Sequence, residues 1–273
     1  NGKRGKNPEC KAIRSMSVLS QMQSRLPSDI EKYAQTIKTI QYVQTTLSNM
    51  FVLEPIPSLM RGYSRIGDSV LRRNCSNISA VLASIQENSP DDWQKFCDII
   101  ASLPENEIQG ISFVKTTIND VILIQKEQNG KSTENIDATR LSDGTLRCIA
   151  VLAAVISEPE HSLIAIEELD NGIHPSRIIK LIKSLCEIAQ RRKIDLVLTT
   201  HNVTVLNGLS KEDVLGVSVV YRDKETQASR IVPFVEIENQ AGILASGGIG
   251  TAMESERLLD EIKNEKEIVP FDF

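Results

Sequence analysis

The sequence predicts a protein of the α/β class, and three observations lead to this prediction. From Leu141 to Leu209, apolar patterns of helical spacing alternate with short apolar runs, in the order helix, strand, helix, strand, helix. Such alternation is typical of a largely parallel sheet covered by helices. From Ile108 to Lys126, alternating apolar and polar residues favour two strands of a hairpin or meander. Before residue 108, the apolar residues recur mainly at helical spacing.

Length and composition indicate a soluble globular protein. The 273 residues suffice for one large domain or two smaller ones, and 41% hydrophobic with 25% charged residues is ordinary for this class. The formal charge of −5 argues against nucleic-acid binding through bulk charge. The longest apolar run, Cys148 to Ile156, is too short to span a bilayer. We therefore expect a cytoplasmic protein without a membrane segment.

The five cysteines are widely scattered, without a Cys-x-x-Cys pair or a histidine at metal-ligand spacing. This pattern predicts reduced, mostly buried thiols and no zinc site. The positions are Cys10, Cys75, Cys97, Cys148 and Cys186.

We predict three regions along the chain. Residues 1–107 form a mainly helical insertion or lid region, residues 108–235 form the α/β core, and residues 236–273 form a tail with a glycine-rich hinge and a helix. The expected helices outside the core are Ala12–Leu26, Ser28–Met50 with Ser28 as N-cap, a short helix ending at Ile85, Ser89–Leu103 and Met253–Lys263; a strand is expected from Phe51, and a hairpin of Val214–Tyr221 with Arg230–Val235.

An acidic turn follows the predicted strand Ser162–Ile166. The strand ends in Glu167 and Glu168, and a glycine-containing turn through Asp170 leads to Pro175 at a helix start. Carboxylates at the carboxyl end of a strand lie where open α/β sheets bind ligands. Paired acids there suit Mg²⁺ and a water molecule made nucleophilic beside a phosphate. Taken alone, a buried strand followed by a solvated acidic turn is an equally good interpretation.

Two further motifs flank this turn. Ser142 and Gly144 stand at the predicted start of a helix, where free backbone N–H groups and the helix dipole favour an anion. His201 follows the predicted strand Ile194–Thr199 and can donate a hydrogen bond to a phosphate oxygen. Each motif is also explained as a helix cap or a polar strand end, but the ordered set favours a nucleotide site.

This ordered set resembles the ABC-type ATPase heads, in the soluble branch of AAA ATPases related to SMC, RecF and the overcoming-lysogenization-defect proteins. The resemblance covers residues 108–235. It implies a head that binds and hydrolyses ATP with Mg²⁺ and that forms a homodimer or higher homo-oligomer, head to tail, through the nucleotide interface. Carried over onto this sequence, it implies that Ser142 and Gly144 are signature residues supported by Arg147, Glu167 is the Walker B acid that holds the metal, Glu168 is the catalytic base, Asp170 lies in the D-loop and His201 is the switch histidine.

The sequence departs from the family pattern in two ways. The Walker B metal ligand is usually Asp, whereas Glu167 stands here, as in several soluble relatives. No Walker A loop is present: Gly130-Lys131-Ser132 ends like one, but position 125 is Gln, and the following residues are strand-like. Because the chain begins with Asn rather than Met, we expect the loop in a further N-terminal segment or a separate polypeptide.

Other functions remain open at this stage. A non-catalytic regulatory or scaffolding subunit is the main alternative, and any nuclease activity is expected in a partner protein, because no Asp-x-Asp pair follows His201. His174 has two equal interpretations, a turn residue or a contact of the D-loop across a dimer. The basic loop residues Arg61, Arg72 and Arg73 fit a solvated surface better than a DNA contact. A role in anti-phage defence or DNA repair is suggested only by the processes in which similar heads take part.

Overall fold

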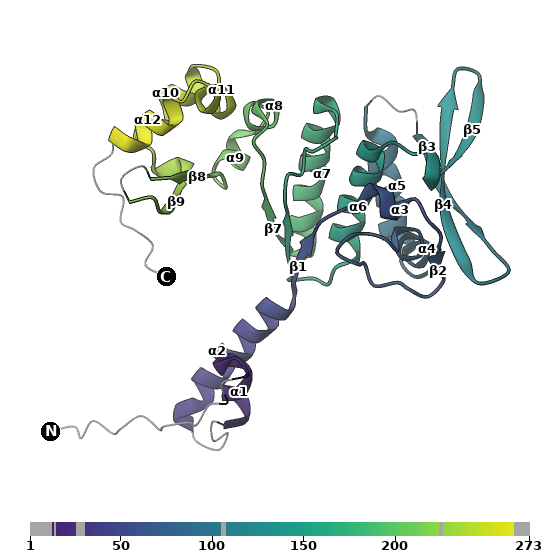
Figure 1. Cartoon of the computed structure of the whole chain (residues 1–273), viewed down its shortest axis with the longest axis horizontal. Coiled ribbons are helices and arrows are strands. Elements are labelled where there is room, and N and C mark those ends of the chain that lie inside the picture. The colour runs from purple at the N-terminus through teal and green to yellow at the C-terminus, as the bar shows by residue number, and fades with distance from the viewer. Residues whose placement is uncertain (1–12, 14, 26–30, 105–107, 224–225, 265–273) are drawn as a thin grey trace.

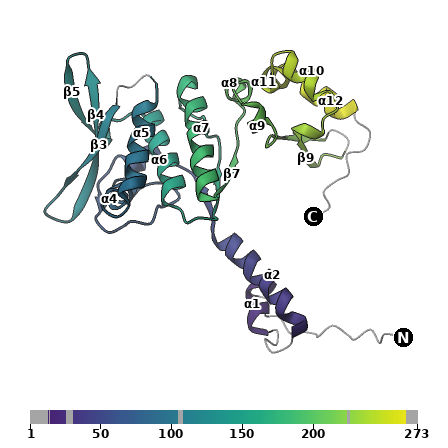
Figure 2. The ribbon, with the colours of Figure 1, turned by 180° about the vertical axis from the view of Figure 1, so that it is seen from behind.

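The computed structural model describes residues 13, 15–25, 31–104, 108–223 and 226–264. A central parallel sheet with its helices lies between an antiparallel sheet at one end and a small C-terminal group of helices and strands at the other (Figure 1). A helical hairpin formed by α1 and α2 extends away from this body, which the opposite view also shows (Figure 2). The predicted N-cap Ser28 and the thiol of Cys10 lie outside the described residues.

The central sheet has three parallel strands in the order β1-β6-β7. These strands are Met50–Leu53, Leu163–Ile166 and Asp195–Leu198. Their register aligns Leu53, Ile166 and Leu198, so the three strands end at the same level. The parallel sheet predicted from the helix–strand alternation is therefore confirmed. The domain division at residue 107 stays a prediction, and strand β1 lies on its N-terminal side.

Helix α6 (Asp143–Ser157) lies at the centre of the main core. It contacts strand β6 and the helices α3 (Pro57–Met60), α4 (Ile78–Asn88), α5 (Pro90–Ser102) and α7 (Pro175–Arg192). Every side-chain position from Gly144 to Ile156 is buried, apart from Arg147, which is half-buried. Small residues such as alanine let its neighbours approach on all sides, so the helix orders the surrounding elements.

The antiparallel sheet has the order β2-β4-β3. Strand β5 also pairs with β4, along a part of it that β2 does not occupy. Its strands are Ser64–Arg65, Ile108–Lys115, Asp120–Asn129 and Ser132–Asp137, and a 3-10 turn, Ala138–Arg140, leads from β5 towards α6. Asn129 pairs with Ser132, so Gly130 and Lys131 form the hairpin turn, with Gly130 at φ +61°. The Gly-Lys-Ser run is thus part of a β-hairpin, which confirms that it is not a P-loop.

The N-terminal hairpin consists of α1 (Val18–Arg25) and α2 (Glu31–Ser48), which pack against each other. Helix α1 begins later than the predicted Ala12. The buried Gln21 side chain explains this difference, because its Nε2 donates to the carbonyls of Ile13 and Met16, both at 2.9 Å. These bonds hold a turn in place of the first helical residues.

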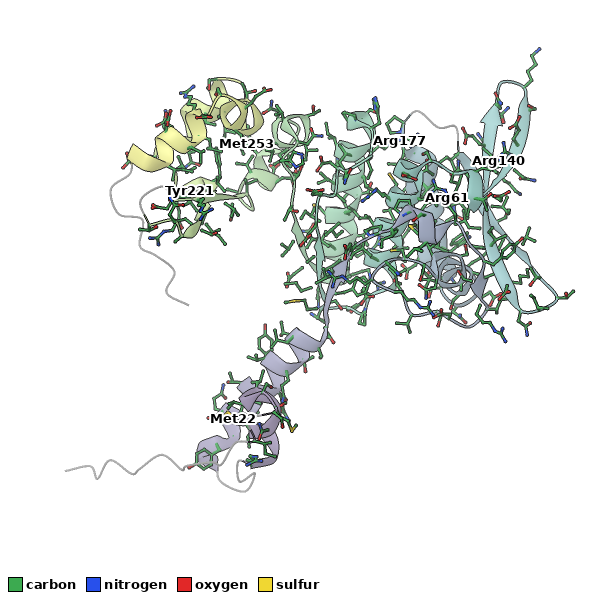
Figure 3. The ribbon with its side chains drawn as sticks, viewed as in Figure 1. Met22, Arg61, Arg140, Arg177, Tyr221 and Met253 are labelled. Carbon is green, nitrogen blue, oxygen red and sulfur yellow. The ribbon has the colours of Figure 1, made fainter. Side chains whose placement is uncertain are left out.

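The C-terminal group has its own small core. Its elements are α8 (Val203–Asn207), α9 (Lys211–Val214), β8 (Ser218–Arg222), β9 (Ser229–Pro233), the 3-10 turn Phe234–Glu236, α10 (Gln240–Ala245), α11 (Ile249–Glu254) and α12 (Arg257–Asn264). Tyr221 and Met253, labelled in Figure 3, pack against this core, whereas Arg61 and Arg177 belong to the main body.

Two predictions for this group were wrong in detail. Val214 ends the short helix α9 instead of opening a strand, because Ser210 and Asp213 form a capping box at that helix. The single helix expected at Met253–Lys263 is divided into α11 and α12, because Glu256 adopts a left-handed backbone conformation at φ +58°. The division lets both helices bury apolar residues in the same core.

The described cysteines are free thiols, as predicted. Burial raises the pKa of Cys75 to about 12 and that of Cys148 to about 11. Both thiols are therefore neutral at pH 7, and the packing of α6 involves no thiolate. Within the described ranges, no helix combines the length and apolar character that crossing a bilayer requires.

Substitution of Ile149 by Ala should destabilise the protein, because this α6 side chain is fully buried and its loss leaves a cavity. We expect the free energy of unfolding to fall by about 2–5 kcal/mol, measured by urea denaturation. Ile118→Ala is the control, since Ile118 is 69% exposed, and its effect should stay within about 0.5 kcal/mol. Equal effects of the two substitutions would contradict the central place of α6.

Candidate functional site

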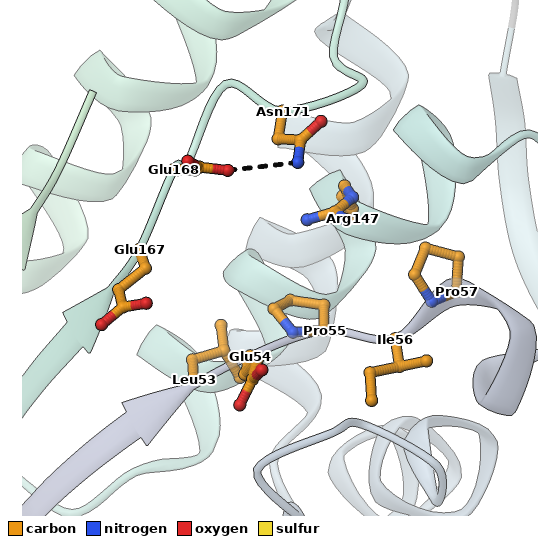
Figure 4. A pocket seen from close by; sticks show the side chains of 9 residues that line it. All are labelled: Leu53, Glu54, Pro55, Ile56, Pro57, Arg147, Glu167, Glu168 and Asn171. Carbon is orange, nitrogen blue, oxygen red and sulfur yellow. Dashed lines mark hydrogen bonds between the residues drawn. The ribbon is translucent and has the colours of Figure 1, made fainter. Parts of the chain in front are cut away.

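The carboxyl ends of β1 and β6 form one wall of a pocket of about 300 Å³. Because Leu53 and Ile166 are aligned, the next residues, Glu54 and Glu167, stand side by side at the same edge of the sheet. The pocket is lined by Leu53, Glu54, Pro55, Ile56, Pro57, Arg147, Glu167, Glu168 and Asn171 (Figure 4). The predicted metal ligand Glu167 and the predicted catalytic base Glu168 therefore line the same cavity.

Glu168 occupies a strained position at this pocket. Its backbone is left-handed at φ +46°, which costs a non-glycine residue about 1–3 kcal/mol. Its amide donates to Thr199 Oγ1 at 3.0 Å, and Asn171 Nδ2 donates to Glu168 Oε2 at 3.4 Å (Figure 4). The strained backbone and the two hydrogen bonds place the exposed carboxylate of Glu168 at the rim of the pocket.

Asp170 lies deeper in the acidic turn and is buried. Thr200 Oγ1 donates to Asp170 Oδ1 at 2.6 Å, so the buried carboxylate is satisfied by a residue at the end of the neighbouring strand. The backbone adds a second link, because the Leu169 amide donates to the Thr199 carbonyl at 3.2 Å. The predicted D-loop and the end of β7 are thus held together.

The predicted signature residues begin helix α6. Ser142 is the N-cap, and its Oγ accepts from the Thr145 amide at 3.1 Å. Arg61 fixes this helix start from outside, since its Nη2 donates to the Leu141 carbonyl at 2.9 Å and to Asp143 Oδ1 at 2.6 Å. Ser142 is exposed, although its hydroxyl is directed at Thr145, to whose Oγ1 it also donates at 2.9 Å.

The packing of Gly144 within this chain explains why the position is a glycine. A Cβ atom at this position would lie 2.4 Å from the carbonyl oxygen of Gly172, in the acidic turn. The glycine therefore allows the start of α6 to pack against the D-loop backbone. This contact explains Gly144 without a phosphate, and its contact with nucleotide stays a prediction.

Arg147 is the one cation among the residues that line the pocket. It comes from α6 and faces the cavity with Glu168 and Asn171 (Figure 4). In the part of the chain that the structure describes, Arg147 forms no hydrogen bond or ion pair. A half-buried guanidinium beside three carboxylate side chains can bind an anionic group such as phosphate.

The two histidines of interest occupy loop positions. His201 is exposed three residues after the end of β7 and does not line the pocket. The next residue, Asn202, caps helix α8 by accepting from the amides of Thr204 and Val205. His174 is the N-cap of α7 and accepts from the Ser176 amide at 3.4 Å. This cap favours the structural interpretation of His174, while the switch role of His201 stays a prediction.

Glu54 is a site residue that the sequence alone did not reveal. It lines the pocket from the end of β1 and forms an ion pair with Arg73 at 3.3 Å. Its place directly after a strand was readable, but the pairing of β1 with β6 was not, because 113 residues separate Leu53 from its partner Ile166. Arg73 is therefore a surface cation that pairs with an acid of the site.

The acids at the pocket fit Mg²⁺ better than a metal held by protein alone. Within the described residues, no group of three or more His, Cys, Asp or Glu side chains could hold an ion. Mg²⁺ is normally held by one or two carboxylates together with waters and phosphate oxygens. Glu167, with Glu54 beside it, supplies this kind of incomplete ligand set.

The parallel sheet, the acidic pocket at its carboxyl edge and the capped helix beside it are the features of an ATPase-type α/β head. Residues 39–207 match the family described as "AAA domain, putative AbiEii toxin, Type IV TA system". This match covers more than half of the chain, and the protein belongs to this family. The prediction that the chain belongs to the AAA class is thereby confirmed.

A search of curated proteins finds no match. Similar solved structures include the Smc head domain with a coiled coil and joint from Pyrococcus yayanosii, at 12% identity and a TM-score of 0.40, covering 60% of this chain and 30% of that one. Another is the Smc head bound to the C-terminal winged-helix domain of ScpA, at 13% and 0.43, covering 67% and 54%. A third is the Smc head with an extended coiled coil bound to the C-terminal domain of ScpA from Pyrococcus furiosus, at 10% and 0.38, covering 90% and 52%. The chain thus spans 30% to 54% of the length of these three proteins.

The substitution Gly144→Ala should destabilise the protein, because the new methyl group would collide with the Gly172 carbonyl. We expect a loss of about 1–3 kcal/mol in the free energy of unfolding, measured by urea denaturation. Gly62→Ala is the matched control, since no atom lies within 4 Å of a Cβ at that position. A neutral Gly144→Ala would show that the D-loop does not depend on this contact.

Proposed function

We propose that the protein binds and hydrolyses ATP, with Mg²⁺, in a head-to-tail dimer or higher homo-oligomer. The observation that carries this proposal is the meeting of Glu167, Glu168 and Arg147 at one pocket on the carboxyl edge of the parallel sheet. Acids there can serve a metal and a water, and a cation there can serve a phosphate. The membership in a family of AAA domains supports the same chemistry.

Each residue would have a distinct role in this reaction. Glu167 would hold Mg²⁺ through water, and bound Mg²⁺ would supply charge neutralisation at the phosphates. Glu168 would orient the attacking water and take its proton, because its carboxylate stands at the pocket rim. His201 would donate to the γ-phosphate from the end of β7, and its exposure leaves it accessible to a nucleotide.

The signature residues would act on a second subunit. Ser142 is exposed at the N-terminus of α6, where an anion is favoured by the helix dipole and free amides. Arg61 and the Gly144–Gly172 contact hold this helix start against the body of the protein. The signature residues of one subunit could therefore complete a nucleotide site on another subunit. Asp170, in the D-loop, would lie between the two subunits.

The phosphate-binding loop would come from outside residues 1–273. Among the described strands, β7 pairs only with β6, so its other edge is free to accept a strand. Val197, on this edge strand, is 49% exposed, which is unusual for a strand of a parallel sheet. An added strand and its loop would approach Glu167 and His201 from this side.

A non-hydrolysing regulatory or scaffolding subunit is the second candidate function. The packing of Gly144 and the capping role of His174 support it, because both residues have structural reasons that need no nucleotide. The family description as a toxin is compatible with a role in anti-phage defence, in which an effector or nuclease partner would respond to the ATPase. If the protein contacts DNA, its local basic loops would make that contact.

Replacement of Glu168 by Gln in the full-length protein should lower phosphate release from ATP by at least about 100-fold, because an amide cannot accept the proton of the attacking water. ATP should then promote the dimer in this variant, measured by light scattering. Glu160→Gln is the control, since Glu160 is exposed at the opposite end of β6 and should leave both measurements unchanged. Equal phosphate release by the Glu168→Gln variant and the wild type would refute the role of Glu168. A molar mass of the Glu168→Gln variant that does not change when ATP is added would refute the nucleotide-bridged dimer.

A further inference from the structure

Two consecutive threonines after β7 contact two of the three acidic residues of the turn after β6, Glu168 and Asp170. Thr199 Oγ1 accepts a hydrogen bond from the Glu168 amide at 3.0 Å. Thr200 Oγ1 donates to Asp170 Oδ1 at 2.6 Å. Neither threonine lines the pocket, so both act on it only through other residues.

The contact of Thr199 coincides with the strained backbone of Glu168. A residue with φ +46° stays in this conformation only where its surroundings hold it. Thr199 supplies two of the restraints, because its hydroxyl accepts from the Glu168 amide and its carbonyl accepts from the Leu169 amide at 3.2 Å. The third is the bond from the Asn171 amide to the Glu168 carbonyl at 2.9 Å.

The strained backbone determines where the Glu168 carboxylate lies. A change of φ at this residue would rotate the Cα–Cβ bond and carry the carboxylate away from Asn171 and Arg147 at the pocket. Among the residues that the structure describes, Thr199 is the only one whose side chain accepts from the Glu168 amide. Its loss would leave the turn free to relax towards an unstrained conformation.

Thr200 connects the D-loop to the residues that follow it in the chain. Its Oγ1 accepts from the Asn202 amide at 3.0 Å while it donates to the buried Asp170. Asn202 in turn caps helix α8. The residues on both sides of His201 are therefore joined to the D-loop through one hydroxyl group.

From these contacts we infer that Thr199 and Thr200 are positioning residues: Thr199 holds the carboxylate of Glu168 at the pocket, and Thr200 holds Asp170 in register with the segment around His201. This inference rests on the proposed ATPase function and assigns the side chains that keep its base in place. Small displacements of a catalytic group of about 1 Å can reduce a rate by about 100-fold.

The test compares Thr199→Val, which removes the hydroxyl at nearly constant shape, with Thr199→Ser, which keeps it, in the full-length protein. The measurements are kcat and KM for ATP from phosphate release, together with the melting temperature. We expect Thr199→Val to lower kcat by at least about tenfold with KM changed by less than about threefold, and Thr199→Ser to recover most of kcat. Thr199 is exposed, so the melting temperature should change little.

Thr117→Val is the control, because Thr117 is exposed in the turn between β3 and β4. The inference is overturned if Thr199→Val keeps the wild-type kcat while Glu168→Gln loses it, or if Thr199→Ser has no higher kcat than a further variant, Thr199→Ala, which lacks the hydroxyl. The serine–alanine comparison also decides the matter if the valine variant does not fold. If Glu168→Gln itself keeps the wild-type kcat, the proposed function fails first, so the two failures are distinguishable.

Discussion

The burial of helix α6 is the constraint on which the rest of this structure depends. Nearly every residue from Gly144 to Ile156 is enclosed by helices α3, α4, α5 and α7 and by strand β6. A helix enclosed in this way cannot rotate or slide without opening cavities. Its first turn and its one half-buried cation, Arg147, are therefore fixed relative to the acidic pocket.

Strand pairing supplies the second half of the site. Aligned strand ends place Glu54 and Glu167 side by side, and the threonines that follow β7 reach the turn that contains Glu168 and Asp170. The left-handed backbone of Glu168 lies where the segment after β6 contacts the segment after β7. Strained backbone in such a position requires support from its neighbours, and here the neighbouring strand end provides it.

The comparison of sequence with structure separates local from non-local information. The N-cap Ser142 and the helix start at Pro175 follow from residue chemistry within a few positions, and the structure places both as predicted. The late start of α1 was missed because the buried Gln21 replaces backbone partners there. The break at Glu256 was missed because an amphipathic pattern continues through it.

The sequence by itself determined the class of fold, the order of the motifs and the family, because periodicity, capping residues and motif spacing are properties of neighbouring positions. Only the tertiary structure decided which strands pair, and hence that Glu54 joins Glu167 at the pocket. It also decided that Gly144 packs on Gly172 and that Thr199 holds Glu168. These contacts join residues 28 to 113 positions apart, and no local pattern records such distances.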